Sequence, residues 1–208
     1  MSDAAPFVCV IDDDPSVRRG LSRLLRAAGF RAAAFASAEE YLQLAPPDPP
    51  ACLVLDVYLP GLNGLDLQRA LADSEVPAPV VFVTGHGDIP MSVRAMKAGA
   101  VDFLPKPFRA EDLLAAVRLA IARHTRTEQQ DAERAEVQRR AASLSPRELE
   151  VLALVVTGIP NKQVGSRLGV TEKTVKAHRA QVMRKMGADS LPDLVRMAQK
   201  LDTQPHQP

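Results

Sequence analysis

The alternation of short apolar runs with amphipathic stretches between residues 7 and 124 constrains this fold most. The apolar runs predict strands at Phe7–Ile11, Arg31–Phe35, Cys52–Asp56, Val80–Thr84 and Val101–Leu104. Between these runs, apolar side chains recur at helical spacing, as at Val17, Leu21 and Leu24. Parallel strands that are joined by crossover helices produce this pattern. We therefore expect an α/β domain with a five-stranded, doubly wound parallel sheet of the flavodoxin-like type.

The last third of the chain predicts a small all-α domain. Its amphipathic segments are Ser145–Thr157, Asn161–Leu168, Thr171–Met186 and Leu191–Lys200. The turn at Gly169 between the second and third segments is short, which is typical of a helix-turn-helix. In the third segment Val175, Val182 and Met186 recur on one face, and basic residues occupy much of the remainder. Such a basic second helix typically enters the major groove of DNA.

These patterns divide the chain into residues 1–123, a connecting segment 124–142, a second domain 143–203 and a tail 204–208. The connecting segment is rich in helix formers, but its apolar stripe is sparse, and Val137 alone makes a poor coiled-coil seam. It therefore predicts a solvated helical linker. The tail predicts disorder.

The charge is asymmetric although the formal net charge is only +1. Acidic residues exceed basic ones in residues 1–123, and basic residues exceed acidic ones in 143–208, which favours a nucleic-acid surface at the C-terminal end. The first twenty residues do not read as a signal peptide, and no apolar run reaches membrane-spanning length. We therefore expect a cytoplasmic protein without a membrane partner. Cys9 and Cys52 lie in apolar runs, which favours core packing over a disulfide.

Polar residues collect where the predicted strands end. Asp12 and Asp13 follow the first strand, Asp56 ends the third, Thr84 ends the fourth, and Lys106 comes just after the fifth. The carboxyl ends of parallel strands form the functional edge of such a sheet, so we expect these side chains to converge. Converging carboxylates repel one another unless a cation offsets their charge. Their oxygen ligands suit Mg²⁺, or Mn²⁺.

An aspartate beside such an ion can attack a phosphoryl group and form an acyl phosphate. Lys106 suits the role of offsetting charge on the transferring oxygens. Thr84 can donate its hydroxyl to a phosphoryl oxygen, which would move the loop that carries Thr84. The space that this movement frees can admit Phe103, and the two positions would make a two-state switch. The competing interpretation is that the acids cap helices, as Asp14 ahead of Pro15 does.

Four strings across residues 7–123 resemble the receiver domain of bacterial response regulators: VCVIDDDPSVR, LVLDVYLPGLNG, VVFVTGHGDIPMSVRAMKAGAVDF and LPKPF. The resemblance implies that Asp56 is the phospho-acceptor and that Thr84, Phe103 and Lys106 form the switch. It also implies that Mg²⁺ is held by Asp13, Asp56 and the backbone carbonyl of Tyr58, with support from Asp12. The Lys106–Pro107 bond is expected to be cis.

Residues 161–186, with SPRELEVLALVVTG before them and SLPDLVRMAQ after them, resemble the C-terminal domain of LuxR/FixJ-type regulators, and the domain order points to the FixJ-like subgroup. The resemblance implies that Lys176, Ala177 and Ala180 face the bases. Phosphate contacts are expected from Lys162, Thr174, Arg179 and Lys185. Lys173 and His178 complete the expected DNA-binding set, although His178 fits a packing role equally well.

Together these resemblances predict a phosphorylation-dependent transcriptional regulator of a two-component system. A sensor histidine kinase would phosphorylate Asp56, and the receiver would form a homodimer through Met91–Met96, Val101–Leu104 and Leu113–Ile121. Promoter double-stranded DNA and RNA polymerase are the other expected partners. The protein is not expected to be an enzyme beyond its own phosphorylation and dephosphorylation; a phosphatase would need a second acid at the position of Tyr58. The alternative is a constitutive DNA-binding protein whose receiver serves only as a dimerisation module.

Overall fold

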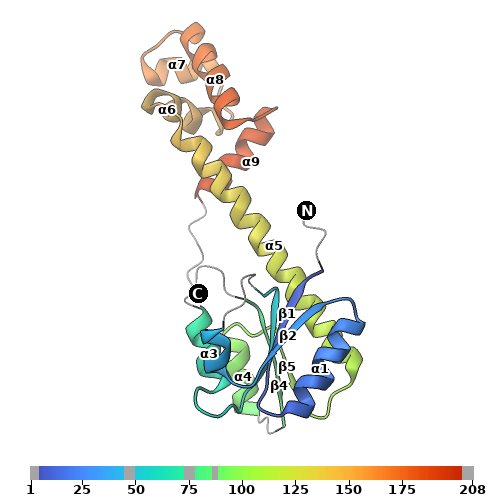
Figure 1. Cartoon of the computed structure of the whole chain (residues 1–208). Coiled ribbons are helices and arrows are strands. Elements are labelled where there is room, and N and C mark those ends of the chain that lie inside the picture. Colours follow the sequence, from blue (N-terminus) through green and yellow to red (C-terminus); the bar gives the residue numbers. More distant parts are fainter. Residues whose placement is uncertain (1–4, 45–49, 73–77, 86–88, 203–208) are drawn as a thin grey trace. The chain divides into compact units, whose positions relative to one another are not determined.

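The computed structural model describes residues 5–44, 50–72, 78–85 and 89–202. The chain divides into two compact units, Met1–Thr127 and Glu128–Pro208 (Figure 1). Each unit has its own buried hydrophobic residues. The predicted disordered tail lies outside the described residues. Within the described ranges, none of the helices has both the length and the apolar character needed to cross a membrane.

A five-stranded parallel sheet forms the centre of the first unit. Its strands are β1 Phe7–Ile11, β2 Arg31–Phe35, β3 Cys52–Asp56, β4 Val80–Thr84 and β5 Asp102–Pro105. Their order in the sheet is β2-β1-β3-β4-β5, and every neighbouring pair is parallel. The predicted fold class and the first four strands are confirmed, and β5 begins and ends one residue later than expected. The connections change direction between β1 and β3, so the carboxyl ends of these strands border the crevice where such sheets bind ligands.

Helices cover both faces of the sheet (Figure 1). They are α1 Pro15–Ala27, α2 Ala38–Gln43, α3 Gly64–Ala72, α4 Ile89–Lys97 and the first part of α5 Ala110–Ala142. Val8 and Val10 pack with α1 and α5 on one face, whereas Cys9 and Ile11 pack with α2, α3 and α4 on the other. Burial on both faces explains why these strands are continuously apolar. Cys9 and Cys52 are buried and free, as predicted.

Helix α5 is a single helix of 33 residues that contributes to both cores. Leu113 and Val117 are fully buried in the first unit, whereas Val137, only 6% exposed, lies in the core of the second unit. The predicted linker is thus helical and most of its residues are exposed, but one face of its second half packs against the core of the second unit. The sequence pattern did not show this because only Val137 and Ala141 of this segment reach the core.

The second unit adds four helices to the end of α5: α6 Pro146–Val155, α7 Asn161–Leu168, α8 Glu172–Met186 and α9 Leu191–Asp202. Ser145 and Glu148 form a capping box at the start of α6, and the hydroxyl of Thr171 accepts from the backbone N–H of Thr174 at the start of α8. The predicted buried face of α8, Val175, Val182 and Met186, is confirmed.

Candidate functional site

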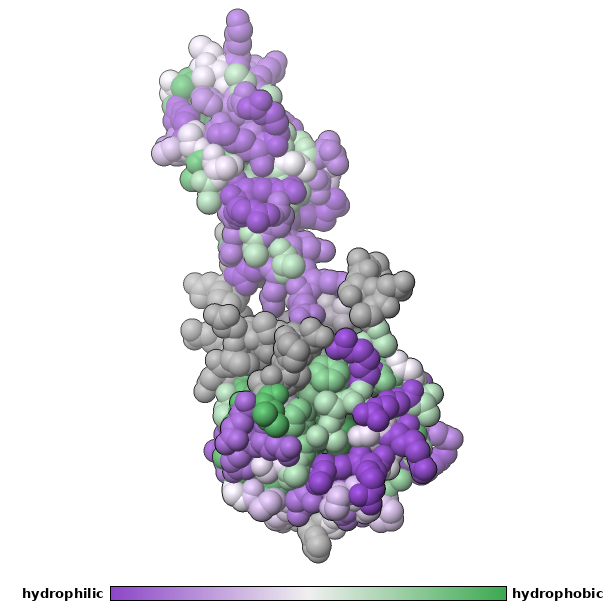
Figure 2. Space-filling view, viewed as in Figure 1, coloured by the Kyte–Doolittle hydropathy of each residue, from purple (hydrophilic) through white to green (hydrophobic). Residues whose placement is uncertain are grey.

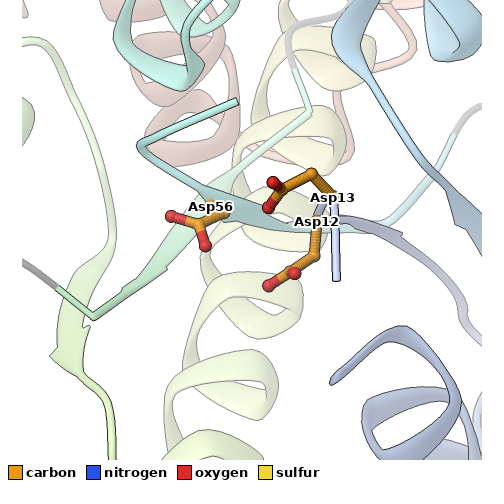
Figure 3. Close-up of side chains that lie close together, drawn as sticks. All are labelled: Asp12, Asp13 and Asp56. Atoms are coloured by element: carbon orange, nitrogen blue, oxygen red, sulfur yellow. The ribbon is translucent and has the colours of Figure 1, made fainter. Parts of the chain in front are cut away.

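Three carboxylates converge at the carboxyl edge of the sheet (Figure 3). Asp12 and Asp13 follow β1 and Asp56 ends β3, and one carboxylate oxygen from each lies within 4.8 Å of the others. Asp12 and Asp56 are buried, whereas Asp13 is exposed. The sheet register explains the meeting, because β1 and β3 are hydrogen-bonded neighbours with Ile11 opposite Leu55.

Lys106 reaches both buried carboxylates. Its Nζ lies 2.6 Å from Asp12 Oδ2 and 2.7 Å from Asp56 Oδ2. Its backbone N–H donates to the carbonyl oxygen of Thr84, and the bond from Lys106 to Pro107 is cis, as expected. Burial lowers the pKa of Lys106, but the hydrogen bonds to Asp12 and Asp56 outweigh burial and leave that pKa raised. Lys106 is therefore a fixed cation between the two buried acids.

Asp12 is the most deeply placed acid of the cluster. Its Oδ1 accepts from the backbone N–H of Asp14 at 2.9 Å, and its Oδ2 accepts from Lys106. Burial raises the pKa of Asp12, and these two hydrogen bonds offset that effect only in part. Asp14 itself caps α1 by accepting from the backbone N–H groups of Ser16 and Val17. The capping interpretation is thus confirmed for Asp14, while the three converging acids require another role.

The backbone after β3 shapes the approach to Asp56. The backbone N–H of Tyr58 donates to Asp56 Oδ1 at 3.0 Å, while Tyr58 as a whole is 53% exposed. Gly64, the first residue of α3, lies so near that a Cβ atom there would overlap the carbonyl oxygen of Asp56. Sequence reasoning did not assign Gly64 a role; its place in the string LPGLNG was the available signal.

Thr84 and Phe103 occupy the neighbouring strands. Asp56 pairs with Val83, so Thr84 is the next residue of β4 beyond it, and Thr84 is fully buried. Phe103 on β5 lies opposite Phe82, with ring centroids 6.2 Å apart, and is only partly buried. The expected switch residues thus lie on adjacent strands at the same edge of the sheet as the acids.

The second candidate surface is the basic helix pair α7 and α8 of the second unit. Figure 2 shows hydrophilic residues over much of the visible face of this unit. Helices α7 and α8 meet through Gly169, which adopts a left-handed conformation with φ 66°. A Cβ atom on Gly165 would lie 2.7 Å from the carbonyl oxygen of Val170, so the glycine permits the close turn. Of the predicted DNA-binding residues, the exposed ones are Lys162, Lys173, Lys176, Ala177 and Ala180, and the half-buried ones are Thr174, His178, Arg179 and Lys185.

Two of the half-buried cations have partners inside the unit. Arg179 donates to Asn161 Oδ1 at 3.3 Å, which ties α8 to the start of α7. Lys185 Nζ lies 2.6 Å from Glu148 Oε2 and also donates to the carbonyl oxygen of Ser143. The hydrogen bond from Lys185 lowers the pKa of Glu148 to about 2. The structure therefore reveals a packing role for Lys185 that the sequence did not indicate.

Comparison with known protein families assigns a family to each of the two domains. Residues 8–118 match the response regulator receiver domain, and residues 142–198 match the luxR family of bacterial regulatory proteins. The chain therefore belongs to the two-component response regulators with a LuxR-type DNA-binding domain, which are transcriptional regulators rather than conventional enzymes.

Its relatives include Nodulation protein W of Bradyrhizobium diazoefficiens, which is 52% identical over 94% of this chain and 86% of the relative. The transcriptional regulatory protein FixJ of Azorhizobium caulinodans is 44% identical over 95% of this chain and 93% of the relative. Among solved structures, the response regulator StyR has a TM-score of 0.83 at 44% identity. The match covers 95% of this chain and 100% of the StyR chain.

Proposed function

We propose that Asp56 accepts a phosphoryl group from the phosphohistidine of a sensor histidine kinase and that this reaction controls promoter binding. The observation that carries the proposal is the position of Lys106 between Asp12 and Asp56. A carboxylate oxygen of Asp56 attacks phosphorus, the phosphorus–nitrogen bond of the donor breaks, and the imidazole leaves with that electron pair. Lys106 offsets the charge that gathers on the phosphoryl oxygens.

The donor set also fits Mg²⁺, or Mn²⁺ in its place. Three carboxylates lie together with a single lysine between two of them, and the exposed Asp13 leaves one side open to solvent. Hard oxygen ligands combined with solvent access are what Mg²⁺ requires. Asp13, Asp56 and the backbone carbonyl of Tyr58 would hold the ion, supported by Asp12. When bound, Mg²⁺ neutralises charge on the transferring phosphoryl group.

Phosphorylation of Asp56 would add phosphoryl oxygens that accept hydrogen bonds near the end of β4. Thr84 is buried one residue beyond the strand partner of Asp56, so we expect its hydroxyl to donate to a new phosphoryl oxygen. Movement of Thr84 lets the half-buried Phe103 reorient against Phe82. These two side chains connect the chemistry at Asp56 to the surface of α4 and β5.

That surface supports homodimer formation. Ile89, Val93 and Met96 lie on one face of α4 and are 80%, 45% and 45% exposed. Leu119 adds an exposed apolar side chain on α5. Exposed apolar groups at helical spacing are typical of an interaction surface. A dimer formed here would present two α8 helices to a pseudo-palindromic operator.

In the DNA complex, α8 lies in the major groove. Lys176, Ala177 and Ala180 are exposed and face base edges, whereas Lys162 and Lys173 approach phosphates. The remaining members of the DNA-binding set, at the edge of this surface, are Thr174, His178, Arg179 and Lys185. RNA polymerase is the proposed further partner, in the cytoplasm.

The test compares operator binding by the wild type, Asp56→Asn and the matched control Asp112→Asn, an exposed acid in the first turn of α5. Each protein is titrated with Mg²⁺, with and without a small-molecule phosphoryl donor. We expect phosphate incorporation and tighter DNA binding in the wild type and the control, and neither response in Asp56→Asn. Equal affinity for all three proteins under all conditions would overturn the proposal and favour a constitutive DNA-binding protein.

A further inference from the structure

The C-terminal end of α8 leaves backbone carbonyls that the helix itself cannot satisfy. Gly187 adopts a left-handed conformation there, and its N–H donates to the carbonyl oxygen of Arg184. The N–H of Ala188 donates to the carbonyl oxygen of Met183. The carbonyl of Met186 is satisfied from outside the helix, because Arg140 on α5 donates to it at 2.9 Å.

The guanidinium of Arg140 is held in place from two sides. Its Nε donates to Glu136 Oε1 at 2.7 Å, one turn earlier on α5. Beyond it lies Gly187, where a Cβ atom would come within 2.5 Å of the terminal nitrogen of Arg140. The side chain of Met186 is fully buried, so the carbonyl that Arg140 binds belongs to a residue anchored in the core. A cation at this end also complements the helix dipole.

We infer that Arg140 is a positioning residue for α8, and that the last turns of α5 are a working part of the DNA-binding domain. Val137 packs into the core of the second unit one turn before Arg140. Lys200 on α9 makes an ion pair with Glu133, one turn earlier again. Three successive turns of α5 are therefore fastened to this unit, and the last of them holds α8 directly.

The effect on DNA reading follows from how α8 is held along its length. Its first turn is fixed by the Thr171 cap and its middle by the bond from Arg179 to Asn161. Its last turn depends on Arg140 and on the ion pair of Lys185 with Glu148. Base recognition requires side chains held within about half an ångström. Loss of Arg140 frees the last turn and lets the helix tilt, although none of the predicted contact residues is itself substituted.

The test uses the full chain and compares Arg140→Ala with Arg139→Ala. Arg139 is its neighbour and a matched control, because it also pairs with Glu136 but its side chain is 78% exposed. Amide hydrogen exchange of Gly187 and Ala188 reports on the last turn of α8. Binding to a specific operator and to unrelated DNA, each measured over a range of salt concentrations, reports on recognition of the base sequence.

For Arg140→Ala we expect exchange of these two amides to be about tenfold faster, the low end for loss of a hydrogen bond to a charged group. Specific binding should weaken by about tenfold, whereas non-specific binding and the salt slope should match those of Arg139→Ala. If Arg140 were instead a phosphate contact, both kinds of binding would weaken and the salt slope would fall by about one unit. That result, or identical behaviour of the two variants, overturns the inference.

Two further variants keep the test decisive if Arg140→Ala folds poorly. Arg140→Lys retains the cation and should restore most of the exchange protection. Gly187→Ala strains the left-handed turn in any background, but it displaces the guanidinium only where Arg140 is present, so it should accelerate exchange less in the Arg140→Lys background than in the wild type. Additive effects would overturn the inference. Because the DNA arm rests on α8 as the reading helix, absence of specific binding by the wild type would refute the proposed function, while the exchange arm would still test Arg140.

Discussion

Val137→Ala tests whether the end of α5 stabilises the C-terminal unit. Val137 is only 6% exposed and lies in the core with Val151, Val182 and Met186. The substitution removes two methylene equivalents, worth about 1.6 kcal/mol at roughly 0.8 kcal/mol each. A residual cavity adds to that cost, and the better helix propensity of alanine offsets about 0.5 kcal/mol. We expect a net loss of about 1.5 kcal/mol, or roughly 6–12 °C in the melting temperature of the unit.

The measurement is hydrogen exchange across a urea series, which reports the unfolding free energy of each unit separately. Val93→Ala is the control, because Val93 is 45% exposed on α4 and its truncation should change stability by less than about 0.5 kcal/mol. The loss should be confined to residues 128–202. A change below about 0.5 kcal/mol for Val137→Ala, or a loss confined to the first unit, would refute the assignment of this turn to the second core.

Three further predictions concern single groups. Lys185 lowers the pKa of Glu148 from 4.5 to about 2. This ion pair therefore stabilises the folded state above pH 4.5, and the stabilisation is lost as the pH falls toward 2. When the unfolding free energy is measured against pH, Glu148→Gln should lack that loss. Burial raises the pKa of Cys9 to about 12 and raises that of Cys52 as well, so iodoacetamide at pH 8 should modify neither thiol until urea unfolds the chain; rapid labelling of the native protein would contradict this. Gly64→Ala should destabilise the receiver by about 1–3 kcal/mol and slow phosphate incorporation, because its Cβ meets backbone; unchanged unfolding would show that the loop can move aside.

Much of the phospho-acceptor site could be predicted because parallel strands place their ends along one edge of the sheet. Asp12, Asp13, Asp56 and Lys106 each lie at the end of a predicted strand or just after it, and the fold brings them together as expected. The sequence did not reveal which acids Lys106 would contact, because that depends on the path of the loop after β5. Nor did it reveal how closely Gly64 approaches the backbone of Asp56.

The sequence by itself determined the α/β class, the strand end at which each polar site residue lies, and the helix-turn-helix. These features follow from periodicity, caps and turn residues that act locally. Only the tertiary structure decided the role of the last turns of α5. Its apolar contribution there is limited to Val137 and Ala141, and the bond from Arg140 to Met186 joins residues 46 positions apart. A contact of that kind leaves no periodic signal, because it depends on where two helices meet rather than on the pattern along either one.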